Sequence, residues 1–419
     1  MRWVNLLLLF FSAFIVFADK QVFGYAAEPL MNEFGINSAQ WGILGSSFFW
    51  LFIITSFVGG TWSDRLGTTK IIFIVLGGLT IVQLGAYAII GLPMLMLYRI
   101  LLGAFEGPFL PTGMSHITHR FPTELRGLAL SIFISAASLG GIISSPILVA
   151  MMEKYGWRWT FVSLGVLSLT MLVIWGMMDR YSKDKQKPTS SKANQLKWSE
   201  IVPVLRNPAC FLTLALSAAT YCFILWMALW APIYLTKVIK LEPMQMAYAI
   251  SASGVASLVM VILISSISDH IFKKSQSYRK ARVLVAAITT IIGGLALAVI
   301  PLLGNSILWI CVALCVAKGS TYVNVSMSTQ VMIKLMPERA GLMSSILTLG
   351  NNTTQLVAPI VIGILVQAGG ANLELGFNYS IYSMVGLFIL TSVLYLIFVK
   401  PDNVSNDVYT TNSSKGEVV

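Results

Sequence analysis

Twelve apolar stretches, each about as long as a membrane is thick, divide this chain. A helix needs about 20 mostly apolar residues to cross the hydrocarbon core. Such stretches occupy residues 4–27, 40–60, 71–91, 93–115, 127–150 and 159–178, and then 209–236, 245–267, 283–303, 306–333, 341–366 and 379–399. Only 11% of the 419 residues are charged, against roughly 25% in soluble domains. We therefore predict an all-α membrane protein of about 12 transmembrane helices.

The formal charge of +11 is distributed unevenly along the chain. If each apolar stretch crosses the membrane once, 21 of the 28 Lys and Arg residues fall on the side of the N-terminus, four fall on the other side and three lie within stretches. Cytoplasmic loops of membrane proteins carry such an excess of basic residues. We expect both termini in the cytoplasm, and nucleic-acid binding is not needed to explain the charge.

A long polar segment separates two groups of six stretches. The sequence predicts an N-terminal six-helix bundle at residues 1–178, a cytoplasmic linker at 179–206, a C-terminal six-helix bundle at 207–400 and a disordered cytoplasmic tail at 401–419. The tail is rich in Asn, Ser and Thr and has no apolar periodicity, as is typical of disordered segments.

The two groups show signs of an internal repeat. The segment 122–128, PTELRGL, resembles the segment 337–342, PERAGL, and a proline follows in each next helix, Pro146 and Pro359. Two six-helix repeats about a central linker form the major facilitator fold, in which substrate binds near the midplane between the halves.

A loop signature follows the second apolar stretch. Gly60-x-x-x-Asp64-Arg65-x-Gly67 fits the major facilitator loop pattern, with its final basic residues reduced to Lys70. A carboxylate at a helix end can pair with a neighbouring helix or with its dipole, so we expect Asp64 and Arg65 to latch one conformation. The alternative is that both are solvated loop charges.

The fourth stretch carries Arg99 and Glu106. Residues seven apart return to nearly the same face of a helix, about 10 Å apart along its axis. Gly103 and Gly107 remove side-chain bulk from this region and allow close helix approach. Ionisable residues inside a membrane are costly and usually functional, although an ion pair that only holds helices together is the alternative.

Five charged residues lie inside the predicted membrane spans. Asp19 and Lys20 stand in the first span and Lys318 in the tenth, in addition to Arg99 and Glu106. Three cations against two carboxyls favour an anionic substrate. Burial favours a protonated carboxyl and a neighbouring cation favours an ionised one, so such carboxyls can carry protons. Lys318 is either a cavity cation or a side chain that reaches for the membrane surface.

Several segments resemble the anion:cation symporter family of the major facilitator superfamily, which includes bacterial sugar-acid/proton symporters and vesicular glutamate and sialic acid transporters. The most specific is 99–111, RILLGAFEGPFLP, followed by 121–127, FPTELRG; further matches are 156–161, GWRWTF, 230–235, WAPIYL, and 350–352, GNN. The resemblance implies that Asp19 and Glu106 are protonatable carboxyls. It also implies that Lys20, Arg99, and Asn352 or its neighbour Asn351 bind substrate.

The chain departs from that family at several positions. Lys20 stands where family members generally have Arg, so a forked contact becomes a point charge. Phe17, Phe52 and Ala137 replace the Tyr, Tyr and Gln that are typical of sugar-acid carriers. Lys318 lies outside the family pattern, and it suggests a second acidic group on the substrate.

We expect a symporter that imports a small organic anion, a carboxylate such as a sugar acid, together with protons. Proton-coupled efflux of drugs or metabolites and a non-translocating sensor are the alternatives. We expect no enzyme activity, cofactor or metal site, since His116, His119 and His270 fall near cytoplasmic loops without metal-ligand spacing. The short extracytoplasmic loops favour the plasma (inner) membrane of a bacterium. We also expect the protein to be a monomer.

Overall fold

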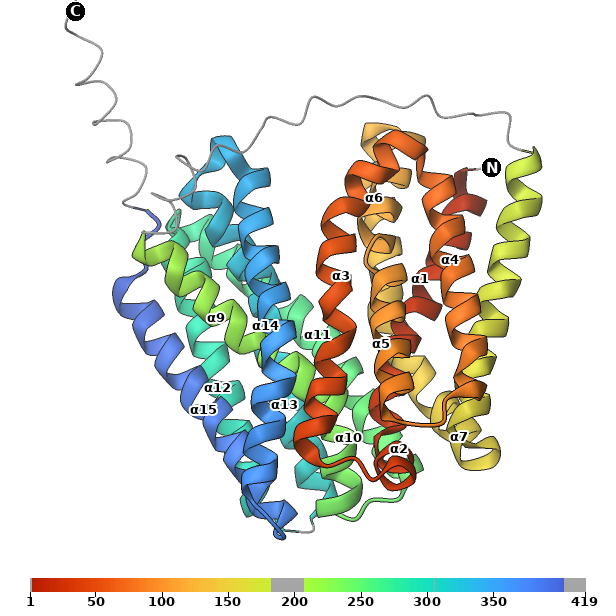
Figure 1. Ribbon diagram of the computed structural model, residues 1–419. Coiled ribbons are helices and arrows are strands. Elements are labelled where there is room, and N and C mark those ends of the chain that lie inside the picture. The colour runs from red at the N-terminus through yellow and green to blue at the C-terminus, as the bar shows by residue number, and fades with distance from the viewer. Residues whose placement is uncertain (1, 182–206, 305, 403–419) are drawn as a thin grey trace, which may run out of the picture. The chain divides into compact units, whose positions relative to one another are not determined.

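The computed structural model describes residues 2–181, 207–304 and 306–402, in which every regular element is helical. The first part of the chain (Figure 1) forms α1 (Arg2–Tyr25), α2 (Ala27–Phe34), α3 (Ser38–Leu66), α4 (Thr68–Leu84), α5 (Leu92–Glu106), α6 (Phe109–Arg120) and α7 (Thr123–Tyr181). The second part forms α9 (Pro208–Leu225), α10 (Ala231–Ile233), α11 (Pro243–Ser275), α12 (Leu284–Val299), α13 (Ile307–Leu335), α14 (Ala340–Ala368) and α15 (Leu373–Phe398). The all-α prediction is confirmed.

The helices of the described residues account for the predicted crossings. Ten helical runs are long and apolar enough to span a membrane. One of them, Thr123–Met178, holds two predicted spans, because Gly156 with φ 81° breaks its helical path. Helices α5 and α6 are each too short to qualify, at 15 and 12 residues, but together they cover the predicted span 93–115. The ten runs therefore account for eleven crossings, since Thr123–Met178 crosses twice. Helices α5 and α6 together provide the twelfth.

The surface of the described residues carries many large exposed apolar side chains, unlike the surface of a soluble protein. Ile81, Ile90 and Leu302 are 74%, 85% and 76% exposed, whereas the hydroxyl residues Ser46 and Thr112 are buried. Soluble monomers rarely expose large contiguous apolar patches. In lipid, by contrast, apolar side chains face outward and helices satisfy their own backbone hydrogen bonds. The membrane-protein class predicted from the sequence is confirmed.

Packing divides the chain into two compact units. Unit 1 comprises Met1–Ala193, Leu225–Ser251 and Leu356–Glu374, and unit 2 comprises Asn194–Ile224, Ala252–Gln355 and Leu375–Val419. In unit 1, α1 and α4 pack on α7, and α3 packs on α5 (Figure 1). In unit 2, α12 packs on α13. The predicted bundles 1–178 and 207–400 stay a prediction, and residues 182–206 of the predicted linker and 403–419 of the predicted tail lie outside the described residues.

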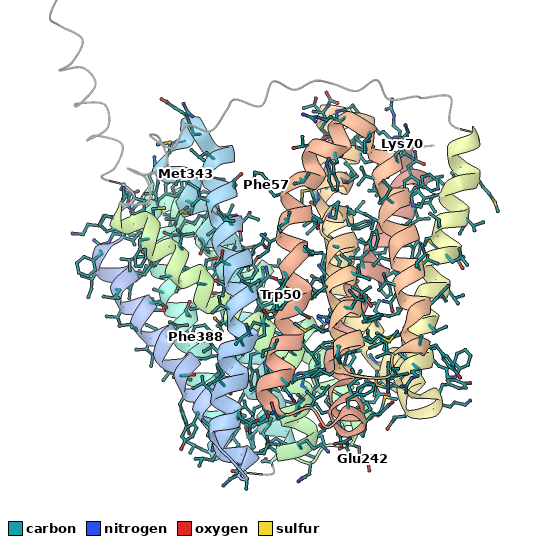
Figure 2. The ribbon with its side chains drawn as sticks, viewed as in Figure 1. Trp50, Phe57, Lys70, Glu242, Met343 and Phe388 are labelled. Atoms are coloured by element: carbon teal, nitrogen blue, oxygen red, sulfur yellow. The ribbon has the colours of Figure 1, made fainter. Side chains whose placement is uncertain are left out.

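The connections alternate between the two ends of unit 1, as membrane-crossing helices require. Figure 2 shows Lys70, in the first turn of α4, and Glu242, just before α11, at opposite ends of this unit. We name these the Lys70 end and the Glu242 end. That the Lys70 end faces the cytoplasm stays a prediction from the charge bias.

Glycines allow α3 and α5 to approach closely. A side-chain carbon added at Gly103 would overlap the Phe48 carbonyl oxygen, and one added at Gly107 would overlap Thr55 and the Phe52 carbonyl oxygen. These contacts bring the backbone of α5 directly against α3, as small residues do in membrane helix pairs. The position of α5 matters for function because it carries two of the buried charges.

The predicted internal repeat has a local structural counterpart. Ser131 and Ser345 each donate a hydrogen bond of 2.9 Å to the carbonyl oxygen four residues earlier, at Gly127 and Gly341. Pro146 and Pro359 both lie inside helices, α7 and α14. The two related segments therefore share this serine hydrogen bond, although the second begins with a 3₁₀ turn at Pro337–Arg339.

Candidate functional site

Helix α1 directs its two charged residues toward different neighbours. The Asp19 side chain, in a residue only 2% exposed, accepts a hydrogen bond from the Gln83 amide of α4. The Lys20 ammonium lies 3.5 Å from the Glu106 carboxylate of α5. Adjacent residues on an α-helix point about 100° apart, which explains why one turn of α1 serves two helices.

Helix α5 brings Arg99 and Glu106 to the same face, as their spacing predicts. Both are buried, at 3% and 2% exposure. The Asp19 carboxyl interacts with Glu106 and with Arg99. The four residues Asp19, Lys20, Arg99 and Glu106 therefore form one group in unit 1, which we call the charged cluster.

Phenylalanine rings surround the two cations of the charged cluster. The Lys20 ammonium lies 5.2, 5.6 and 4.6 Å from the ring centroids of Phe17, Phe48 and Phe52. The Arg99 guanidinium carbon lies 3.9 Å from the Phe23 centroid and 4.7 Å from that of Phe48. Aromatic faces attract cations and leave their hydrogen-bonding capacity free. The departures Phe17 and Phe52 thus contact a predicted substrate-binding residue.

Two neutral residues that the sequence interpretation missed complete the surroundings of Asp19. The Tyr98 hydroxyl donates a 2.7 Å hydrogen bond to the Gln83 side-chain carbonyl, and Gln83 in turn donates to Asp19. The amino-acid sequence contains a signal for Gln83, since it is a polar residue in an apolar stretch. The sequence interpretation considered only residues with a formal charge and therefore did not include Gln83.

The charged cluster retains unused hydrogen-bonding capacity. Within the described residues, Asp19 Oδ2, Arg99 Nε and both Glu106 oxygens have no partner of good hydrogen-bond geometry, although Glu106 lies against the Asp19 carboxyl and pairs with Lys20. Buried polar groups are normally satisfied, and exceptions call for an explanation. A carboxyl oxygen of this kind can accept a proton, and a cation of this kind can attract an anionic ligand.

Unit 2 holds the other predicted substrate-binding residues. The Lys318 ammonium in α13 lies 3.4 Å from the Ser253 hydroxyl oxygen. The Asn351 side-chain oxygen lies 2.7 Å from the Ser217 hydroxyl oxygen, and that of Asn352 accepts a 3.1 Å hydrogen bond from Gln355. Asn351 is buried at 8% exposure. Of the two asparagines, it is the one tied to a neighbouring helix.

The predicted latch is described only in part. Asp64 and Arg65 occupy the last turn of α3, which Gly67 ends with φ 89°. The Arg65 side chain is exposed, and the Asp64 side chain lies outside the described residues. The latch role stays a prediction. In unit 2, the residues Ser265-x-x-x-Asp269 of α11 form a degraded copy of the loop signature. There Asp269 Oδ1 accepts a 2.5 Å hydrogen bond from Arg282, a residue that the sequence interpretation missed.

The sequence profile of the Major Facilitator Superfamily matches residues 9–352, most of the chain. The chain belongs to the Major Facilitator Superfamily. Two relatives of this facilitator are a D-galactonate transporter of Escherichia coli O6:H1, 25% identical over 88% of this chain and 90% of that one, and a probable galactarate/D-glucarate transporter of Bacillus subtilis, 24% identical over 96% and 92%. These names agree with the resemblance to the anion:cation symporter family.

A solved structure supports the fold of this facilitator. A bacterial homologue of the human lysosomal transporter Spinster has a TM-score of 0.81 at 18% identity, over 95% of this chain and 97% of that one. At this identity the likeness shows the major facilitator fold alone. The family membership identifies a transporter rather than an enzyme, as the sequence predicts.

The sequence interpretation placed three histidines at loops, but all three lie in helices, with His119 in α6 and His270 in α11 both exposed and His116 buried. His116 is not a loop residue: it lies in α6 at 1% exposure, with Nδ1 2.8 Å from the Thr68 hydroxyl and its ring against Trp175. The apolar run appeared to end before it, but α6 continues to Arg120. Among the described residues, no three His, Cys, Asp or Glu side chains are grouped to hold a metal ion.

Unit 1 of the facilitator also has a cavity of about 260 Å³ near the Glu242 end. Its lining includes Tyr25, Glu28, Glu153 and Thr236 but none of the predicted site residues. Glu28 forms an ion pair with Lys237 beside it. The charged cluster is therefore distinct from this cavity.

Proposed function

We propose that this facilitator is a proton-coupled symporter that imports a small organic anion, a carboxylate, by alternating access. The observation that carries the proposal is the buried charged cluster, in which Lys20 lies 3.5 Å from Glu106 and Arg99 interacts with Asp19. The names of the relatives, which refer to sugar acids, support the substrate class.

Charge balance links the proton to the anion. Two cations and two carboxylates neutralise one another when the cluster is empty. A proton on Glu106 removes the negative charge that faces Lys20, so the ammonium gains affinity for a substrate carboxylate. The same exchange applies to Asp19 and Arg99. The anion therefore binds best to the protonated cluster, and this differential affinity is what couples the two movements.

The coupling can drive accumulation. Two protons that move with one monovalent anion carry one net positive charge inward. At about 100 mV this movement is worth about 2.3 kcal/mol. Since about 1.4 kcal/mol corresponds to a factor of ten, the membrane potential alone supports a gradient of about fiftyfold.

The remaining roles follow from this proposal. Asp19 and Glu106 carry protons, and Lys20, Arg99, Lys318, Asn351 and Asn352 bind the substrate. Asp64 and Arg65 stabilise one conformation at the Lys70 end, which faces the cytoplasm together with both termini. The protein acts as a monomer in the plasma membrane of a bacterium.

Amide substitutions test the coupling. We expect Asp19→Asn and Glu106→Gln to abolish uphill uptake of galactonate into proteoliposomes with an inward proton gradient, because an amide cannot carry the proton. Exchange of internal for external galactonate should persist in at least one variant, since the cations remain. The control is Glu374→Gln, which removes an exposed carboxyl in the first turn of α15. Accumulation at the normal level in both amide variants contradicts the proposal.

A further inference from the structure

Lys318 lies deep within α13. Eleven residues separate it from the start of this 29-residue helix, which places it about 16 Å from one end and about 26 Å from the other at 1.5 Å per residue. A lysine side chain is too short to reach either end. Its ammonium contacts Ser253 of the neighbouring helix α11 instead. Of the two sequence-based alternatives, an inward-facing cation fits this geometry.

The surroundings of the Lys318 ammonium carry no formal negative charge. Its contacts among the described residues are the Ser253 hydroxyl at 3.4 Å, the Tyr322 ring at 5.5 Å and the nearby Cys315 thiol. None of the ion pairs of the described residues includes it, whereas Lys20 has Glu106. Lys318 is partly buried. A cation inside a membrane span without a counter-charge is costly, so it fits a site that an anion completes.

Polar side chains extend from Lys318 across unit 2. Tyr322, one turn further along α13, interacts with Tyr221 of α9, and the Tyr221 hydroxyl hydrogen-bonds with Asn351 of α14. We name Lys318, Tyr322, Tyr221 and Asn351 the Lys318 band. Its members offer an ammonium, two phenols and an amide. These groups supply several hydrogen-bond donors and no formal negative charge, a combination that suits a carboxylate or a sulfonate.

We propose that the Lys318 band binds an acidic group and that the substrate of this transporter is a dianion, a dicarboxylate or a sulfocarboxylate. This inference rests on the proposed function and narrows its substrate class. Two protons that move with a dianion carry no net charge, so the proton concentration gradient and not the membrane potential drives its accumulation. Once both of its carboxyls are protonated, the charged cluster of unit 1 has two positive charges, and Lys318 adds a third with no carboxylate in contact. A dianion leaves one of these charges uncompensated and a monoanion leaves two, so charge balance favours the dianion.

The side chains around Lys20 support the same substrate class. Phe17 and Phe52 present rings to the ammonium and have no hydroxyl to offer. A polyhydroxylated monoanion gains little from such a lining, since its hydroxyls lose water without finding partners. A compact dianion without hydroxyl groups binds through charge alone. Cations held against aromatic faces can provide this attraction.

Paired ligands that differ by one acidic group test this inference on the purified full-length protein. Glutarate and pentanoate have the same chain length and differ by a carboxylate in place of a methyl group, and galactarate and galactonate form the hydroxylated pair. We expect the wild-type protein to bind each dianion more tightly than its monoanion. Lys318→Gln should weaken dianion binding by about tenfold to a hundredfold, as loss of a charge-assisted hydrogen bond does, and should lower the ratio of dianion to monoanion affinity.

Two further variants make the test specific. Lys318→Arg keeps the charge and should keep most of the preference for dianions. Lys334→Gln removes a charge from the last turn of the same helix, where Lys334 lies 5.2 Å from the Tyr278 ring centroid, and should leave both affinities unchanged. Thermal unfolding of Lys318→Gln in detergent, compared with the wild-type protein, shows whether the variant is folded.

The outcomes separate the two proposals. An equal loss of monoanion and dianion binding in Lys318→Gln, or no loss of either, overturns the dianion inference and leaves the proposed symport of a small anion intact. Failure of the wild-type protein to bind any of the four anions overturns both. A selective loss of dianion binding that Lys318→Arg restores supports the Lys318 band as an anion subsite.

Discussion

At the scale of single residues, the Lys20 ammonium combines one carboxylate contact with three aromatic contacts. Glu106 lies 3.5 Å away on one side, and the rings of Phe17, Phe48 and Phe52 surround the rest. Its side chain is 30% exposed, whereas that of Glu106 is fully buried. Lys20 is therefore held in place without all of its donors being used, and such preorganisation benefits ligand binding.

The ring of Phe52 should contribute to anion affinity. We expect Phe52→Leu to weaken binding of an organic anion about twofold to fivefold, because loss of a cation–π contact costs about 0.5–1 kcal/mol at a partly exposed site. The matched control is Phe57→Leu, which changes a 79% exposed side chain on the same helix (Figure 2). Equilibrium binding of galactarate measures both. Equal losses in the two variants would contradict a specific role for Phe52.

At the scale of helices, close backbone contact places the charges of α5. Arg99 and Glu106 reach Asp19 only because Gly103 lets α5 lie against the Phe48 carbonyl of α3. The charged cluster thus depends on Gly103, a residue that has no functional group of its own.

Gly103→Ala should test this dependence. The added methyl group meets backbone and not a flexible side chain, so we expect a loss of about 1–3 kcal/mol in unfolding free energy, as overpacking causes, and reduced anion uptake. Gly77→Ala is the control, since an added carbon there meets only Leu172 at 3.9 Å. Thermal unfolding in detergent compares the two. A Gly103 variant as stable as wild type would show that α3 and α5 can separate without cost.

At the scale of the whole molecule, ion pairs outside the membrane spans tie connections of unit 1 together. Glu33 of α2 accepts hydrogen bonds from Arg158 at 2.6 and 3.1 Å and from the Trp157 indole at 2.8 Å. Arg158 also donates to the Ile89 carbonyl oxygen. Three connections that are distant in sequence therefore meet at the Glu33–Arg158 ion pair.

The stability of this arrangement should depend on pH. The hydrogen bonds from Arg158 lower the pKa of Glu33 despite an opposing effect of burial, and Trp157 lowers it further. A carboxyl whose folded pKa is depressed stabilises the protein above its unfolded value, about 4.3 for Glu, and this stabilisation is lost as the pH falls through the folded pKa.

We therefore expect Glu33→Gln to lower the thermal midpoint at pH 7, and the difference from wild type to shrink as the pH falls below about 4. Thermal unfolding in detergent over a pH series measures it. Glu153→Gln, which removes an exposed carboxyl outside the described ion pairs, should show no such trend. A difference for Glu33→Gln that stays constant with pH would rule out the ion pair as its cause.

Hydropathy and charge spacing were sufficient to predict the twelve crossings, the all-α class and the five charges inside the spans, because each of these is a property of a short segment. Arg99 and Glu106 share a face for the same reason. Even the boundary at Gly156 follows from a local backbone conformation, although the sequence interpretation placed a longer loop there.

Only the tertiary structure decided which groups meet. Asp19 and Gln83 are 64 residues apart and the Lys318 and Ser253 side chains 65 apart, and no local pattern links such pairs. Helix packing also decided that Lys20 faces a carboxylate and three rings, while Lys318 faces only neutral groups. The sequence determined that these charges lie in the membrane, since burial in lipid depends on composition. Their partners depend on which helix faces come together, which is a property of the folded chain.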